Sequence, residues 1–386
     1  MTPERFRAHF PALRDTVHLC SCSEGAQSDR VIAAMAEFMH SWREHGAPWG
    51  RWMEMVEEAR SAFARLIHAS PDEVAVVACA SDGAHQVASS LPLAPGRTTF
   101  LTNDLEFPSI GHVWLAQAEA RGARVRNLPA VAGMVREEDY IEAMDESTAL
   151  VSAPLAAYAN GLRLPIRAIA DRAHKIGARV FVDAYQGAGV LPVDVRALDC
   201  DYLVAGALKY LLGTPGIAFL YVRREIIAEH RPLHTGWFGR ANPFAFDPRT
   251  LDFGPSARRF ETGTPAIPAA YAAAAGLGLL EELDMADVER HVAALAQRLQ
   301  DRLLDQGVAL FSPLDPALRG PQVTVRTTAP DALTAFLAER RILASPRGDA
   351  VRLSLHHYND EDDVSRAAGA VTAFFNANAD ARAFPA

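Results

Sequence analysis

Residues 179–222 read RVFVDAYQGAGVLPVDVRALDCDYLVAGALKYLLGTPGIAFLYV, and this stretch decides the predicted fold. Three apolar runs in it, at residues 179–182, 202–205 and 217–222, have the length and β-branched content of strands buried on both faces. Asp183 directly follows the first run, and Lys209 closely follows the second. Ligands of open α/β sheets bind at the carboxyl ends of the strands, so both side chains are expected at one ligand site.

An acid and a lysine at neighbouring strand ends predict a site for pyridoxal phosphate. A lysine amine holds this cofactor as a Schiff base, and a carboxylate keeps its ring nitrogen protonated so that the ring acts as an electron sink. The alternative is that Asp183 and Lys209 are ordinary solvated side chains, as most residues of these types are. Residues 205–212 contain no other charge, and no cation adjoins Asp183, which favours the ligand site.

Four motifs carry a resemblance to a known family. They are residues 182–186 (VDAYQ), 209–216 (KYLLGTPG), 259–265 (RFETGTP) and 351–354 (VRLS). On these motifs, the chain resembles the class V aminotransferase group of fold-type-I pyridoxal phosphate enzymes. That group includes cysteine desulfurases, kynureninases and isopenicillin N epimerase-like proteins. The resemblance implies the α/β fold of the fold-type-I PLP-dependent transferases.

The sequence predicts a large domain and a small one. Strand candidates alternate with helical stretches through most of the chain, which indicates a mostly parallel sheet covered on both faces. The pattern then changes to a charged helix at residues 285–304 and short strands, the first at residues 308–311, which indicate an α+β domain. We therefore expect a PLP-binding large domain at residues 15–280, a small C-terminal domain at residues 281–386 and a short N-terminal segment at residues 1–14.

The resemblance implies two catalytic residues and contacts to the cofactor ring. Lys209 forms the Schiff base and, once released, takes the Cα proton as general base, while Asp183 pairs with the ring nitrogen. Gln186 is expected to bond the phenolic oxygen of the cofactor. Phe107, in the E-F-P-S motif at residues 106–109, is expected to stack on the ring, with a core phenylalanine as the alternative.

A phosphate site is predicted where the strand at residues 74–77 leads into a helix, because N–H groups at a helix start bind phosphate. The family places small hydroxyl residues here, and Ser81 matches them. Asp82 departs from that pattern because a carboxylate repels phosphate, so we expect its N–H to serve with the side chain turned away. The alternative is that Ser81 or Asp82 simply caps the helix. By resemblance, Gly263 and Thr264 reach the cofactor phosphate of a neighbouring subunit, which implies a homodimer with shared active sites.

Two residues are expected to contact the substrate. Arg352 alternates with Val351 and Leu353 on a strand candidate, and its guanidinium binds a carboxylate as a bidentate fork. Fixing the α-carboxylate of an amino acid decides which Cα bond breaks. A surface arginine is the alternative. Trp237 lies in a segment that resembles the G-W-W-G-H segment of kynureninases, and by that resemblance it borders the pocket.

The predicted function is that of a pyridoxal phosphate-dependent enzyme that forms a carbanion at Cα of a free amino acid, with transamination as the leading reaction. A β-eliminating or kynureninase-like lyase, which cleaves C–S or C–C bonds, and an epimerase stay open, because lysine and aspartate serve all of them. A non-catalytic regulatory protein that binds pyridoxal phosphate is the alternative of another class. Residues 343–350 contain no cysteine where desulfurases of the group carry their catalytic one, so persulfide-forming sulfur transfer is not expected. Cys22 is the one thiol expected near the site.

Composition excludes several classes of partner. The 386 residues carry a net charge of −9 and no run rich in Lys and Arg, so neither nucleic acid nor a membrane is an expected partner. The four cysteines form no disulfide framework and no histidine cluster joins them, so no metal site is predicted. A charged N-terminus unlike a signal peptide predicts a cytoplasmic location. Residues 263–280 are uncharged, but their Ala, Gly and Pro content indicates a helix buried in protein rather than a membrane span.

Overall fold

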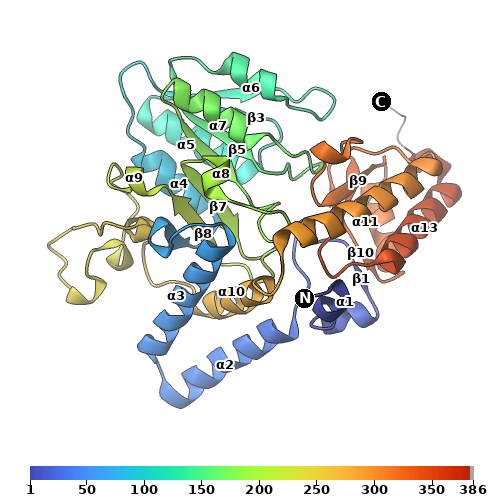
Figure 1. Cartoon of the computed structure of the whole chain (residues 1–386), viewed down its shortest axis with the longest axis horizontal. Coiled ribbons are helices and arrows are strands. Elements are labelled where there is room, and N and C mark those ends of the chain that lie inside the picture. The colour runs from blue at the N-terminus through green and yellow to red at the C-terminus, as the bar shows by residue number, and fades with distance from the viewer. Residues whose placement is uncertain (383–386) are drawn as a thin grey trace.

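A seven-stranded sheet lies at the centre of the larger part of the computed structural model, which describes residues 1–382 (Figure 1). The strand order is β2-β8-β7-β6-β5-β3-β4. Neighbouring strands are parallel except at β8, which runs antiparallel to β7 and β2. The mostly parallel sheet is therefore confirmed, and β8 is reversed because no crossover helix separates it from β7. The strands are β2 (Val74–Val77), β3 (Thr99–Asn103), β4 (Arg124–Leu128), β5 (Thr148–Pro154), β6 (Arg179–Asp183), β7 (Tyr202–Gly206) and β8 (Ala218–Val222).

Helices cover both faces of this sheet because its strands are apolar on both sides. Val180 and Val182 of β6 lie in one apolar core, and Phe181 between them lies in the other. Helices α3 and α10 contribute to the first core, and α4 and α5 to the second. The helices of this part are α2 (Asp29–His45), α3 (Trp49–Leu66), α4 (Ala80–Ser90), α5 (Pro108–Arg121), α6 (Glu137–Ala143), α7 (Ile166–Lys175), α8 (Val195–Leu198), α9 (Arg224–Ile227) and α10 (Ile267–Leu280).

Helix α10 forms most of the uncharged segment at residues 263–280, for which the sequence predicts a helix buried in protein rather than a membrane span. Most of its side chains are buried in the first core, against α2 and α3, so the prediction of a helix buried in protein is confirmed. No helix among residues 1–382 has the length and apolar character needed to cross a membrane.

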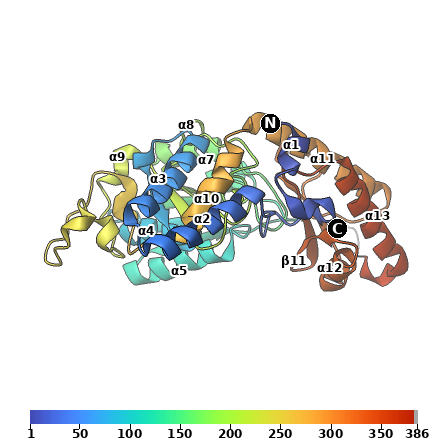
Figure 2. The same cartoon turned by 90° about the horizontal axis from the view of Figure 1, so that it is seen from below.

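The C-terminal part of the chain, from α11 onward, forms a smaller α+β unit with its own apolar core, in orange and red in Figures 1 and 2. Its antiparallel sheet has the order β11-β12-β9. The elements of this part are α11 (Met285–Asp305), β9 (Gln322–Arg326), α12 (Pro330–Ala338), β10 (Ile342–Leu343), β11 (Ser345–Arg347), β12 (Ala350–Ser354) and α13 (Glu361–Ala377).

The strand predicted at residues 308–311 is wrong. Leu310 makes only an isolated bridge to Val325. Just beyond it, the hydroxyl of Ser312 accepts the Thr324 N–H at 2.8 Å, which takes the place of a ladder bond. Pro313 follows and has no N–H to donate, so the pairing ends there.

The first residues of the chain lie against the C-terminal part (Figure 1). Arg7, the last residue of α1 (Pro3–Arg7), donates from Nη1 to Asp363 at 2.8 Å, and β1 (Val17–His18) pairs in parallel with β10. The domain boundaries given above stay predictions, and residues 383–386 of the predicted small domain lie outside the described residues.

Candidate active site

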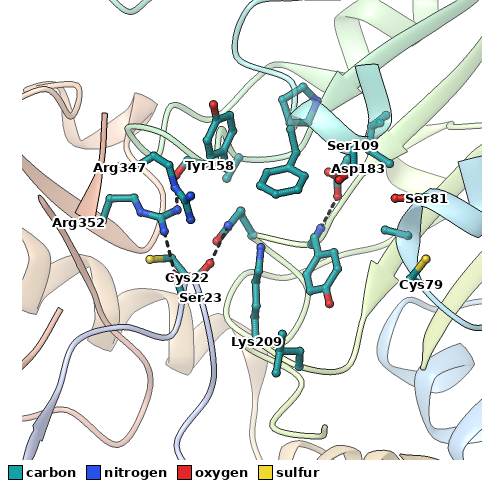
Figure 3. Close-up of a pocket in the computed structure, with 18 residues that line it drawn as sticks. Cys22, Ser23, Cys79, Ser81, Ser109, Tyr158, Asp183, Lys209, Arg347 and Arg352 are labelled. Atoms are coloured by element: carbon teal, nitrogen blue, oxygen red, sulfur yellow. Dashed lines mark hydrogen bonds between the residues drawn. The ribbon is translucent and has the colours of Figure 1, made fainter. Parts of the chain in front are cut away.

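A cavity of about 350 Å³ lies beside the carboxyl ends of β5 and β6, between the large sheet and the C-terminal part (Figure 3). Six residues that the sequence singled out line it: Ser81, Phe107, Asp183, Gln186, Lys209 and Arg352. The other lining residues are Cys22, Ser23, Cys79, Ala80, Ser109, Ile110, Pro154, Ala156, Tyr158, Tyr185, Leu208 and Arg347. The structure therefore brings together residues from both ends of the chain around Lys209.

Close backbone packing sets the position of Lys209. A Cβ at Gly25 would collide with the carbonyl of Lys209, and a Cβ at Gly276 of α10 would collide with the backbone of residues 211–212. Burial lowers the pKa of Lys209 to about 8, and the charge of Asp183 opposes this shift. The neutral, nucleophilic amine is therefore more abundant at neutral pH than in a solvated lysine.

Asp183 ends β6 and is 6% exposed. It accepts a hydrogen bond from the backbone N–H of Tyr185 at 2.8 Å. Burial raises the pKa of Asp183, while the Tyr185 N–H and the charge of Lys209 hold it down. The lysine and the carboxylate that the sequence predicted are thus electrostatic neighbours.

A second buried carboxyl group, Glu106, lies close enough to Asp183 to feel its charge. It accepts hydrogen bonds from the Ser152 hydroxyl at 2.7 Å and the Phe107 N–H at 3.0 Å. Burial raises the pKa of Glu106 to about 8, and the negative charge of Asp183 contributes to this rise. A neutral Glu106 leaves Asp183 as the carboxylate that carries the charge. The sequence showed Glu106 only as part of a motif.

Two aromatic rings flank the amine of Lys209. Its Nζ lies 4.3 Å from the ring centroid of Tyr185 and 5.3 Å from that of Phe107. Tyr158 packs its ring edge-on against Phe107, with centroids 5.1 Å apart. Phe107 was predicted to stack on a cofactor ring, but Tyr185 was not, although it stands inside the Asp-x-x-Gln motif. The slot beside Lys209 suits a flat, conjugated group.

Arg352 and Gln186 present buried polar atoms that lack protein partners. Arg352 is 1% exposed and donates to the carbonyl of Tyr158 at 2.9 Å and to the hydroxyls of Ser23 at 2.9 Å and Ser345 at 2.7 Å. Its Nε has no partner among residues 1–382. Gln186 donates from Nε2 to the carbonyl of Cys22 at 3.0 Å, and its Oε1 is likewise unpaired within the described residues.

The first turn of α4 faces the cavity, as the sequence predicted for a phosphate site. The helix begins at Ala80 with Cys79 as N-cap and no side-chain cap, so neither Ser81 nor Asp82 caps it. Ser81 lines the cavity. The Asp82 carboxylate accepts from the Ala78 N–H at 3.2 Å and lies 3.5 Å from His234 Nδ1. These contacts turn its charge away, as expected for a first turn that is to bind an anion.

Besides Asp82, three predicted site residues lie outside this cavity. Gly263 and Thr264 are exposed, and neither lines it. Trp237 packs on Trp49 and stacks on Phe246, with centroids 5.9 and 5.8 Å apart, and borders a separate groove. The roles predicted for these three residues stay predictions.

The expectation that Cys22 is the one thiol near the site is wrong. Cys79, the N-cap residue of α4, also lines the cavity. Cys20 lies behind the wall, with its Sγ 3.4 Å from His18 Nε2. Where a desulfurase-like loop is expected to bring a cysteine, the β11–β12 hairpin brings Arg347 to the cavity.

Comparisons with known proteins agree with the motifs. Residues 25–367 match the family model described as aminotransferase class-V. A protein of Bacillus subtilis strain 168 named "uncharacterized aminotransferase YcbU" is 35% identical, over 96% of this chain and 98% of its own length. A kynureninase of Deinococcus radiodurans is 28% identical, over 95% of this chain and 92% of its own. A structure of a C-DES mutant, with glycine covalently linked to its PLP cofactor, superposes with a TM-score of 0.87 at 22% identity, covering 95% of this chain and 98% of that one.

Proposed function

The chain belongs to the aminotransferase class-V family of pyridoxal phosphate enzymes, and we propose from this premise that it is an aminotransferase that acts on a free amino acid. The observation that carries the proposal is the placement of Lys209 and Asp183 after neighbouring parallel strands, on the wall of one cavity. A lysine beside a buried carboxylate serves reactions that begin with loss of the Cα proton.

The residues present fit pyridoxal phosphate. The Gln186 Oε1 offers a contact that no protein group among residues 1–382 takes up. The rings of Phe107 and Tyr185 lie 5.3 and 4.3 Å from Lys209 Nζ, so a ring attached to that amine would lie beside them. The uncapped first turn of α4 offers N–H groups and the Ser81 hydroxyl to an anion. The cofactor, when bound, supplies an aldehyde for covalent attachment of amines and a ring that withdraws electrons from Cα.

Each residue then has a distinct task. Lys209 would hold the cofactor and would take the proton from Cα, because its lowered pKa favours the neutral base. Asp183 would hold the proton on the ring nitrogen by its charge. Phe107 and Tyr185, whose rings lie beside Lys209 Nζ, would pack against the cofactor ring. Arg352 would bind the α-carboxylate and so orient the substrate at Cα.

We also propose a homodimer with shared active sites, located in the cytoplasm. Gly263 and Thr264 are exposed outside the cavity of their own chain, as residues that serve a neighbouring subunit must be. Exposed large apolar side chains, such as Phe246, which is 71% exposed, and Trp42 on α2, offer apolar surface that a second subunit could cover. A complementation test decides this: mixed and refolded Lys209→Ala and Thr264→Arg chains regain about a quarter of wild-type activity only if Thr264 serves the partner's site.

The experiment that tests the reaction is a screen of amino acids by cofactor absorbance, followed by mass spectrometry of the products with a keto-acid acceptor present. Transfer of the amino group to the acceptor supports the proposal. Formation of pyruvate and ammonia from β-substituted amino acids indicates a lyase instead. So does cleavage of kynurenine, which is included in the screen because a kynureninase is among the relatives. Loss of optical activity without a keto acid indicates an epimerase. A spectral change without any product indicates a regulatory protein.

A further inference from the structure

Two arginine side chains enter the cavity at the same end. The β11–β12 hairpin pairs Ser345 with Arg352, and Arg347 shares the face of β11 that carries Ser345, because side chains alternate along a strand. The Ser345 hydroxyl accepts from Arg352, and Arg347 and Arg352 both line the cavity. Figure 3 shows the two guanidinium groups at one end of the cavity, with Ser81 and Cys79 at the other.

The charge of Arg352 is not matched by a carboxylate among residues 1–382. Although the residue is 1% exposed, its acceptors are a backbone carbonyl and the hydroxyls of Ser23 and Ser345, all neutral. A buried charge without an opposite charge is costly, and a ligand that supplies that opposite charge removes the cost.

Arg347 likewise makes no ion pair with any described residue. The acid on its own hairpin, Asp349, pairs with Arg326 of β9 at 3.1 Å instead. The only carboxylate on the described cavity wall is Asp183, which the proposed function assigns to the ring nitrogen. This end of the cavity therefore holds two positive charges without a carboxylate partner on the described wall, the buried one of Arg352 and the exposed one of Arg347, and a ligand with two carboxylates can pair with both.

We propose that the substrate carries two carboxylates, so that Arg352 binds the α-carboxylate and Arg347 binds a second one at the end of the side chain. This inference rests on the proposed function, and it names an amino dicarboxylic acid as the substrate class. A substrate with one carboxylate leaves one guanidinium unmatched. The cofactor phosphate does not match it either, because the predicted phosphate site at Ser81 lies at the opposite end of the cavity (Figure 3).

The test compares the binding of succinate and butanoate to the holoenzyme by isothermal titration calorimetry. These four-carbon acids differ in one carboxylate and cannot react, because they lack an amino group. We expect wild type to bind succinate about 10- to 100-fold more tightly, the value of one charged hydrogen-bonded contact. Arg347→Gln should abolish this preference and Arg347→Lys should keep part of it. Arg326→Gln, which removes a nearby positive charge outside the cavity wall, should leave it unchanged.

Equal binding of the two acids by wild type, or an unchanged preference in Arg347→Gln, would overturn the inference. A loss of preference in Arg326→Gln as large as that in Arg347→Gln would also overturn it, because the effect would then come from the general field of the hairpin. The outcome is independent of turnover. An enzyme that transaminates amino acids but binds both acids equally keeps the proposed function and loses this inference.

Discussion

The ring of Tyr185 occupies the space that any side chain at Gly206 would need. A Cβ at Gly206 would overlap the hydroxyl end of that ring. Gly206 ends β7, and Tyr185 follows β6, so the glycine on one strand admits the aromatic ring carried by its neighbour. The centroid of this ring lies 4.3 Å from Lys209 Nζ. The absence of a side chain at Gly206 therefore allows the Tyr185 ring to lie beside the lysine.

Gly206→Ala should weaken cofactor binding by about tenfold, because overpacking displaces Tyr185 from the slot at a cost of about 1–3 kcal/mol. The measurement is a titration of apoenzyme with pyridoxal phosphate, in which quenching of tryptophan fluorescence reports cofactor binding. Tyr185→Ala removes the clash, so the double variant should bind the cofactor as Tyr185→Ala alone does. Fully additive losses in the double variant would show that the two residues act independently.

Lys209→Ala should abolish both covalent attachment of the cofactor and turnover. The lysine is the one on the described cavity wall, and its lowered pKa favours the attacking amine. Borohydride reduction followed by intact-mass measurement should leave the cofactor mass on wild type and none on the variant. Lys175→Ala, on α7 and outside that wall, is the matched control and should keep the label. A label retained by Lys209→Ala would place the attachment elsewhere.

Arg352→Ala should raise KM for amino acids with a free α-carboxylate by an amount equivalent to about 2–5 kcal/mol, the cost of leaving a charged partner unmatched. Arg352→Lys should recover only part of it, since an ammonium lacks the planar fork. Steady-state kinetics give KM and kcat separately, and circular dichroism checks that the variants stay folded without the bonds to Ser23 and Ser345. An unchanged KM would show that another cation binds the α-carboxylate, and Arg347 would be the first candidate.

Glu106→Gln should change how stability depends on pH. The pKa of Glu106 is raised to about 8, above the roughly 4.3 of a solvated glutamate, so the folded state keeps a proton that the unfolded state loses. The stabilisation of the folded state by the protonated Glu106 is complete below about pH 4.3 and is lost as pH rises through about 8. An amide does not titrate, so the variant does not lose this stabilisation. The urea concentration at its unfolding midpoint, relative to that of wild type, should therefore rise between pH 5 and pH 9. Glu37→Gln, on the exposed face of α2, controls for loss of one carboxylate. Parallel curves for wild type and Glu106→Gln would refute the assignment.

Incubation with cysteine should leave no persulfide on the enzyme. The hairpin that faces the cavity presents Arg347 and no thiol, and sulfur transfer needs a thiolate aimed at the substrate sulfur. Cys22 and Cys79 line the cavity from other elements, so intact masses are compared for wild type, Cys22→Ser and Cys79→Ser. A persulfide on wild type that disappears in either variant would restore desulfurase chemistry.

Much of the fold and the centre of the site followed from local patterns. The apolar runs before Asp183 and Lys209 gave the strands β6 and β7 because burial on both faces leaves a continuous apolar sequence. The apolar pattern predicted a strand at residues 308–311 that does not form. There the hydroxyl of Ser312 takes a backbone N–H that a strand would bond through its carbonyl oxygen, and the sequence pattern does not reveal this competition. The reversal of β8 was not anticipated, since an apolar run looks the same in either direction.

The residues that the sequence missed reach the cavity through contacts between distant segments. Ser23 and Tyr158 meet Arg352 only in the folded chain, and no local spacing predicts either contact. Tyr185 stands in the quoted motif, but its direction depends on the space left by Gly206. The place of Arg347 depends on its strand register with Ala350, which fixes the face of β11 that it occupies.

The pairing of β1 with β10 has a consequence for how the protein is made. Residues 17–18 leave the ribosome 325 residues before their partners at residues 342–343. Cys22 and Ser23, which follow β1, close the cavity through Gln186 and Arg352. A nascent chain therefore carries the segment around residues 17–18 unpaired until residues 342–343 have been made, with its apolar residues open to chaperones. The cofactor pocket is completed only after residue 352 has been synthesised, so a chain truncated before that residue has no finished site.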